Sequence, residues 1–260
     1  MSDRPDYQRK KAFFDSLLTI YGRKPVLEVL LDPTVPVFRL HLADSNKPGG
    51  IIAEIEAAAR ARAIDILRHD KQALSRISRN GREDQGVAAD LQLPRYRSLT
   101  QWLEETSLHA GLRLLALDRV TNPQNLGMLI RSACAGGVDG VLIPRQGCAP
   151  LSPLVIKASA GTLFRCPLLR CDELAPALRT LQDRGFTVAT LSSHAEQSLF
   201  DWRMPGARVY VLGNETDGVS AAVSALADQQ IRIPMANGVE SLNVAVTAAL
   251  IAYYGAAQNR

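Results

Sequence analysis

Three short polar segments of this chain carry the residue types that a catalytic site needs, and each follows a hydrophobic run. The segment 213–218 (GNETDG) holds two carboxylates between two glycines, and the segment 240–244 (ESLNV) comes soon after residues 233–235 (IPM). The segment 122–127 (NPQNLG) is followed four residues later by Arg131. Amides, carboxylates and a guanidinium at such turns can orient a polar substrate and accept a proton. We expect folding to assemble the segments into one site.

Each segment also has a purely structural explanation. Asn, Asp and Gly are common in any turn, which explains the segment 213–218 without a ligand. Ser241 and Asn243 open the last helix-like run, where both residue types are common N-caps. The interpretation as a site therefore depends on the joint occurrence of the segments.

Asn125 and Arg131 admit two interpretations as well. Asn125 stands at an expected helix start, where free backbone amides attract anions. Arg131, nearly two turns further on, has a planar fork that suits a phosphate or a carboxylate. A salt bridge from Arg131 to Asp118 or Glu215 explains the spacing equally well.

Several common classes of site are excluded by spacing. No GK[ST] follows the segment 213–218, and its glycines lack the GxGxxG spacing, so neither a Walker loop nor a Rossmann dinucleotide fingerprint is present. The four cysteines form no CxxC pair and the four histidines form no HExxH. We therefore expect no metal site, and the cysteines suit small buried side chains in a reducing compartment.

From Leu112 onward, strand-like and helix-like runs alternate and would position the three segments. This alternation predicts a parallel sheet with helices on both faces, whose ligands bind beyond the carboxyl ends of the strands, where the segments fall. The expected strands are 112–117, 140–143, 186–191, 208–212 and 230–233, and the expected helices are 126–135, 153–160, 173–183 and 242–257.

The N-terminal part has a mixed pattern with a strand-like run at 37–42, helix-forming runs at 51–63 and 71–77, and residues 86–89 that would close a small sheet. It also holds a cluster of seven basic side chains against two aspartates. Such a cluster suits a phosphate-facing surface, because each cation near a phosphate releases a counterion, and it suits a solvated helix face equally well. The cluster consists of Arg60, Arg62, Arg68, Lys71, Arg76, Arg79 and Arg82.

Length and composition describe an ordinary globular protein, long enough for one large domain or two modest ones. The chain has 260 residues, of which 47% are hydrophobic and 22% charged, and a net charge of +4. Without a long apolar run or a secretion signal, we expect a cytoplasmic protein and no membrane partner. We expect one domain over 1–92, with 1–15 disordered, a linker over 93–111 with one helical turn, and a second domain over 112–260.

Together and in this order, the segments resemble the three motifs of the SpoU/TrmH family of SPOUT methyltransferases. The matching stretches are 118–133, 212–218, 233–235 and 240–244, and residues 157–161 are similar to the family's intermediate SAG segment. Each stretch alone is weak, but their joint spacing over about 112–257 is specific.

A weaker resemblance covers the N-terminal part. Residues 20–22 and 85–87 are similar to the small L30e-like substrate-binding domain that often precedes this catalytic domain. Asp84 stands where many relatives carry His, which weakens the expectation of an RNA contact at that loop. Asn122 stands where Asp is more usual, a mild change.

The family transfers a methyl group from S-adenosyl-L-methionine to a ribose 2′-hydroxyl of rRNA or tRNA, and it works as a homodimer. The resemblance implies an α/β sheet with a C-terminal trefoil knot, an RNA-binding N-terminal domain, and Arg23 and Lys24 as further RNA contacts. It places the cofactor against eight residues: Thr190, Leu191, Gly213, Asn214, Gly218, Ile233, Met235 and Leu242.

By the same resemblance, Arg131, Glu215, Asn125, Ser241 and Asn243 form the catalytic set. A guanidinium hardly deprotonates in proteins, so we assign Arg131 to the substrate phosphate and to stabilising the developing alkoxide. Glu215 is the better proton acceptor. The remaining three would position the ribose and the knot loop by hydrogen bonds.

The sequence favours an enzyme that methylates guanosine in 23S rRNA. A tRNA methyltransferase is the alternative within the same family. A non-catalytic RNA-binding or ribosome assembly factor on the same scaffold is the alternative from another class, and the presence of the whole catalytic set counts against it. An unrelated small-molecule α/β enzyme ranks last, because it leaves the basic cluster without a role.

Overall fold

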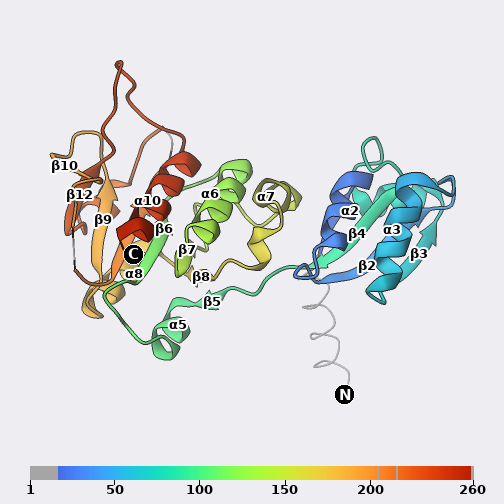
Figure 1. The fold of residues 1–260 in the computed structure, drawn as a ribbon, viewed down its shortest axis with the longest axis horizontal. Helices are drawn as coiled ribbons and strands as arrows, with labels where there is room; N and C mark the ends of the chain where they lie inside the picture. The colour runs from blue at the N-terminus through green and yellow to red at the C-terminus, as the bar shows by residue number, and fades with distance from the viewer. Residues whose placement is uncertain (1–16, 204, 215, 259–260) are drawn as a thin grey trace. The chain divides into compact units, whose positions relative to one another are not determined.

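The computed structural model describes residues 17–203, 205–214 and 216–258, and it divides the chain into two compact units, Met1–Pro94 and Arg95–Arg260 (Figure 1). The segment 1–15 and Glu215 lie outside the described residues. No helix among the described residues is long and apolar enough to cross a membrane.

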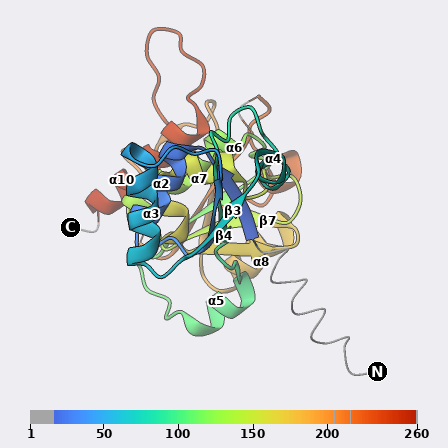
Figure 2. The same cartoon turned by 90° about the vertical axis from the view of Figure 1, so that its right-hand side faces the viewer.

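The first unit is a four-stranded mixed sheet in the order β1-β4-β2-β3, in which β2 and β3 are parallel and the other neighbours are antiparallel. Figure 2 shows α2 and α3 on one side of this sheet and α4 on the other. The elements are β1 (Leu17–Tyr21), α2 (Arg23–Leu31), β2 (Val37–Ala43), α3 (Gly50–Ala61), β3 (Asp65–His69), α4 (Lys71–Ser78) and β4 (Val87–Gln92).

Apolar spacing explains the packing of this unit. Ile52, Ile55 and Ala59 recur at helical spacing on α3 and are buried, which gives the helix one apolar face. The α4 helix begins where the side chain of Asp70 accepts a hydrogen bond from Ala73 N at 2.8 Å, an N-cap.

The second unit is an eight-stranded sheet in the order β10-β12-β9-β11-β6-β7-β8-β5, and every neighbouring pair is parallel. Its strands are β5 (Arg97–Ser98), β6 (Arg113–Leu117), β7 (Gly140–Pro144), β8 (Leu168–Cys171), β9 (Thr187–Leu191), β10 (Gln197–Ser198), β11 (Arg208–Leu212) and β12 (Gln229–Arg232). Its helices are α5 (Leu99–Glu105), α6 (Pro123–Ala135), α7 (Pro153–Ser159), the short 3-10 helix η1 (Thr162–Phe164), α8 (Leu174–Asp183), α9 (Ala221–Ser224) and α10 (Val244–Gln258).

Helices cover both faces of this sheet, as predicted. On one face, α6 packs against α7 and α10. On the other, α5, α8 and α9 bury a continuous core in which Trp102 and Leu178 pack with inward residues of the strands such as Leu114 and Val209. The predicted fold class, a parallel α/β sheet preceded by a small α/β domain, is confirmed; the trefoil knot stays a prediction.

Several elements of the fold differ from the sequence prediction, and β1, α2, β3, β10 and α9 are among those that were not predicted. Residues 93–111, for which we expected a linker, contain β5 and α5: β5 pairs with β8, and α5 buries Trp102 and Leu103 in the core of the second unit. The physical reason is that the apolar side chains of α5 (Leu99, Trp102 and Leu103) are buried against one face of the sheet. The strand β8 was not predicted, because four residues are too few for a periodic signal.

Candidate functional site

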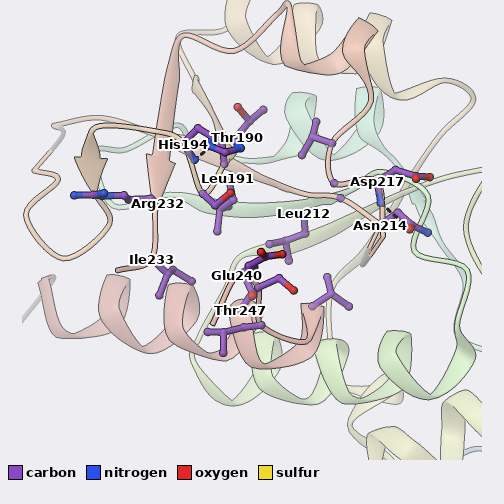
Figure 3. Close-up of a pocket in the computed structure, with 18 of the residues that line it drawn as sticks. Thr190, Leu191, His194, Leu212, Asn214, Asp217, Arg232, Ile233, Glu240 and Thr247 are labelled. Carbon is purple, nitrogen blue, oxygen red and sulfur yellow. Dashed lines mark hydrogen bonds between the residues drawn. The ribbon is translucent and has the colours of Figure 1, made fainter. Parts of the chain in front are cut away.

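A pocket of about 480 Å³ opens at the carboxyl edge of the eight-stranded sheet, where β9, β11 and β12 end (Figure 3). Parallel strands present their carboxyl ends at one edge, which is why segments distant in sequence meet there. All eight residues predicted to bind the cofactor line this pocket: Thr190, Leu191, Gly213, Asn214, Gly218, Ile233, Met235 and Leu242.

The segment 213–218 folds back on itself directly after β11. Asn214 and Gly218 exchange two backbone hydrogen bonds, of 3.0 and 2.9 Å, and the side chain of Asn214 donates to the carbonyl of Arg119 at 3.1 Å. A Cβ at Gly213 would lie 2.2 Å from the carbonyl carbon of Gly218. Glycine is therefore required at 213 by the chain's own fold-back.

The first and third segments meet through two asparagine side chains. Asn122 caps α6, accepting from Gln124 N at 2.8 Å and Asn125 N at 3.2 Å, so the helix begins three residues earlier than predicted. Asn243 caps α10, where its Oδ1 accepts from Ala245 N at 2.8 Å, and its Nδ2 donates to Oδ1 of Asn125 at 2.9 Å. The two helix starts are thus joined beside the pocket.

The other predicted catalytic residues are Ser241, Arg131 and Glu215, and their positions are as follows. Ser241 lines the pocket and is exposed. Arg131 lies on α6, two turns beyond Asn125, with an exposed side chain. Glu215 lies outside the described residues, within a segment whose neighbours Asn214 and Thr216 line the pocket.

The pocket combines apolar walls with one buried polar atom. Leu191, Leu212 and Ile233 come from three adjacent strand ends and form an apolar surface suited to a flat ring. Thr190 is only 1% exposed, and its Oγ1 has no hydrogen-bond partner among the described residues. A buried hydroxyl without a partner is costly, so this atom suits a contact with a bound ligand.

Glu240 and Thr247 are among the residues of the site that the sequence interpretation missed. Glu240 and Thr247 line the pocket from either side of the start of α10. Glu240 belongs to the third segment, and its carboxylate was the signal that should have marked it. Thr247 follows Asn243 by one helical turn, so its place on the pocket face required a helix start at Val244.

The predicted RNA-binding residues of the first unit fall into different environments. The guanidinium of Arg62 donates to the carbonyls of Val29, Leu30, Asp32 and Val35, so its donors are used at the carboxyl end of α2. Arg60 and Arg68 share the carboxylate of Glu56 at 2.9 and 2.6 Å.

Near the other end of the sheet, Arg23 holds the loop before β4, donating from Nε to the carbonyl of Gln85 at 3.2 Å. Asp84 is buried and accepts from Ser78 Oγ at 2.8 Å and Gly86 N at 2.9 Å, so it is a structural member of that loop. The remaining predicted cations have exposed side chains: Lys24, Lys71, Arg76, Arg79 and Arg82.

Comparisons with known proteins match both units. Residues 112–253 match the SpoU rRNA methylase family, and residues 19–97 match the domain described as RNA 2′-O ribose methyltransferase substrate binding. Within the described residues, no group of three His, Cys, Asp or Glu side chains is arranged to hold a metal ion.

Two curated relatives illustrate the similarity. The 23S rRNA (guanosine-2′-O-)-methyltransferase RlmB of Xanthomonas axonopodis pv. citri is 37% identical over 79% of this chain and 82% of its own length. An uncharacterized tRNA/rRNA methyltransferase of Mycolicibacterium vanbaalenii is 34% identical over 95% of this chain and 78% of its own length.

Solved structures share the fold. The SpoU methyltransferase AviRb from Streptomyces viridochromogenes, in complex with the cofactor AdoMet, superposes with a TM-score of 0.71 at 23% identity and covers 96% of this chain and 92% of its own. A putative RNA methyltransferase of the TrmH family from Porphyromonas gingivalis gives 0.70 at 26% identity, covering 95% and 92%.

Proposed function

Because the chain belongs to the SpoU rRNA methylase family, we propose that it transfers the methyl group of S-adenosyl-L-methionine to the ribose 2′-hydroxyl of a guanosine in 23S rRNA. The predicted family and enzyme class, an RNA 2′-O-methyltransferase, are confirmed by this membership. The observation that carries the proposal is the pocket at one sheet edge, which the second and third family segments line and to which the first segment is joined through the hydrogen bond between Asn125 and Asn243.

The residues of the pocket fit the proposed cofactor. A volume of about 480 Å³ lies within the range of small-molecule sites. Leu191, Leu212 and Ile233 would hold the flat ring of the cofactor, and the Oγ1 of Thr190 would gain a hydrogen-bond partner from the bound ligand. S-adenosylmethionine supplies an electrophilic methyl group in this position.

The chain's own side chains orient the ribose and move the proton. The transfer is an in-line displacement, so the attacking oxygen must be held in one position, and the Asn125–Asn243 pair is placed to do this. Glu215 accepts the hydroxyl proton, and Arg131 binds the adjacent phosphate and stabilises the developing alkoxide. Ser241 adds a hydroxyl at the pocket wall.

The assignment of proton transfer to Glu215 and of phosphate binding to Arg131 has a direct test. With Glu215 as the proton acceptor, Glu215→Gln loses activity over the whole pH range, whereas Arg131→Lys keeps a cation and loses less. Full activity of Glu215→Gln across pH, with loss in Arg131→Lys, would reverse the assignment.

We propose that the first unit grips RNA through the exposed cations Lys24, Lys71, Arg76, Arg79 and Arg82. Arg23 supports this surface by holding the Gln85 loop. Each neutralised phosphate contact contributes to a salt-dependent affinity, so Arg79→Gln combined with Arg82→Gln lowers RNA affinity and flattens its dependence on salt. A matched control is Arg60→Gln, since Arg60 is paired with Glu56.

We propose that the enzyme is a cytoplasmic homodimer. Val246 and Tyr253 lie two turns apart on α10 and are 47% and 55% exposed, and Met128 on the neighbouring α6 is 41% exposed. An exposed apolar face across two packed helices suits an interface. Light scattering of Val246→Glu should show a monomer where the parent protein is a dimer.

The activity is tested by mapping ribose methylation in total rRNA and tRNA from cells with and without the gene. Loss of one 2′-O-methylguanosine in 23S rRNA supports the proposal. Loss of a tRNA mark would identify the alternative substrate, and no lost mark in cells that express the gene would favour a non-catalytic RNA-binding factor.

A further inference from the structure

The charged side chains that line the proposed cofactor pocket are few and unevenly placed. Among the described residues they are Asp217, Arg232 and Glu240, with His194 as a further titratable group. Figure 3 shows Glu240 in the middle of the labelled group, between Leu212 and Thr247, whereas Arg232 extends away from the pocket. Among the described residues, the charged group nearest the middle of the pocket is therefore the carboxylate of Glu240, whose side chain is exposed to solvent.

The two carboxylates of the pocket differ in their surroundings. Asp217 lies at the rim, and its Oδ2 is 3.6 Å from Nη1 of Arg119, which offsets its charge. Glu240 forms no ion pair with any described residue and shares its wall of the pocket with Ile233 and Leu242. Because Glu240 is exposed, its charge acts on a ligand in the pocket through a partly screened interaction, in the range of a partly exposed ion pair.

The methyl donor and its product differ in charge. S-adenosylmethionine carries a positively charged sulfonium, and S-adenosylhomocysteine carries a neutral thioether in its place. We propose that Glu240 is the residue that makes the pocket prefer the charged methyl donor over the neutral product. This inference rests on the proposed function, since it assumes that the donor occupies this pocket.

The charge changes during the reaction in a way that fits this role. The bond between sulfur and the methyl carbon breaks, a bond between that carbon and the ribose oxygen forms, and the hydroxyl proton passes to its acceptor. The sulfur becomes neutral, so the attraction of Glu240 is strongest for the bound donor and fades as the methyl group leaves. An interaction of this kind tightens donor binding and assists product release without raising the rate of the chemical step.

The test compares three ligands that differ at one position. Calorimetry measures the affinities of S-adenosylmethionine, S-adenosylhomocysteine and sinefungin, in which an amine replaces the methylated sulfonium and retains a positive charge. In Glu240→Gln, we expect S-adenosylmethionine and sinefungin to bind about fivefold more weakly, which is the range of a partly exposed ion pair. We expect the affinity for the neutral S-adenosylhomocysteine to stay unchanged. The matched control is Asp217→Asn, whose partner Arg119 already offsets its charge, and the ratio of the affinities should stay constant.

Kinetics give a second readout. Glu240→Gln should raise the KM for S-adenosylmethionine without lowering kcat, because the lost interaction stabilises the bound donor more than the transition state. Equal weakening of all three ligands would overturn the proposal, since it would assign Glu240 to the shared amino-acid part or to the folding of its loop. Unchanged affinities for all three ligands in Glu240→Gln would overturn the proposal too. Failure of the parent protein to bind any of the three would instead refute the proposed function.

Discussion

Replacing Asn243 separates two contributions that one side chain makes at the start of α10. Its Oδ1 caps the helix at Ala245 N, 2.8 Å away, and its Nδ2 donates to Asn125 at 2.9 Å. Asn243→Ala removes both hydrogen bonds. Asn243→Ser keeps a hydroxyl that can cap the helix, but it is too short to reach Asn125, so the two variants should differ in stability.

The expected magnitudes follow from these two hydrogen bonds. Loss of an N-cap costs about 1 kcal/mol of unfolding free energy. Loss of the hydrogen bond to Asn125, which is only 9% exposed, costs about 1 kcal/mol more. At roughly 2–4 °C per kcal/mol for a chain of this size, Asn243→Ser lowers Tm by about 2–4 °C and Asn243→Ala by about 4–8 °C.

Thermal unfolding followed by circular dichroism measures both shifts, and Asn125→Ala combined with Asn243→Ala completes a double-mutant cycle. We expect a coupling of about 1 kcal/mol between the two positions, because they share the hydrogen bond. Strictly additive effects would show that the bond between the two segments does not stabilise the site. Equal Tm values for Asn243→Ser and Asn243→Ala would show that the cap contributes nothing.

Three further perturbations have defined outcomes. Gly213→Ala should abolish S-adenosylmethionine binding in a calorimetric titration, because the new Cβ would lie 2.2 Å from the backbone of Gly218; binding at parental affinity would contradict the fold-back. Burial alone would raise the pKa of Asp90, but hydrogen bonds, chiefly from His41, outweigh it and lower that pKa, so the carboxylate stabilises the fold above its unfolded pKa and this stabilisation disappears as the pH falls through the folded value. Asp90→Asn should therefore cost about 2 kcal/mol in urea unfolding at pH 7, with the difference shrinking below about pH 4, and a difference independent of pH would refute the assignment. Burial raises the pKa of the Cys166 thiol to about 12, so at pH 8 it should react with iodoacetamide far more slowly in the folded than in the unfolded protein, and equal rates would contradict its burial.

Local pattern was sufficient for most of the second unit. The predicted strand 208–212 is β11, and the predicted helix 153–160 is α7 to within one residue. The strand β11 is a short apolar run that is buried throughout, and α7 begins at Pro153, a residue that suits the first position of a helix. The short strands β5 and β8 lack such a pattern, and α5 shows its role only through the core that Trp102 enters.

In the site, too, some features could be predicted from local sequence and others only from the packing. The residues and spacing of the three segments carried the resemblance to the family, and that resemblance implied eight residues that the structure places on the wall of the pocket. The basic cluster was less informative, since charge alone does not distinguish Arg62, whose donors are used by backbone carbonyls, from exposed Arg79.

The sequence alone therefore determines which functional groups can bind a ligand and which faces of the helices and strands must be buried. Contacts between distant segments depend on how the chain packs, and no local pattern encodes them. The hydrogen bond between Asn125 and Asn243, the contact of the 213–218 fold-back with Arg119, and the place of Glu240 inside the pocket exist only once β6, β11 and α10 share one sheet edge.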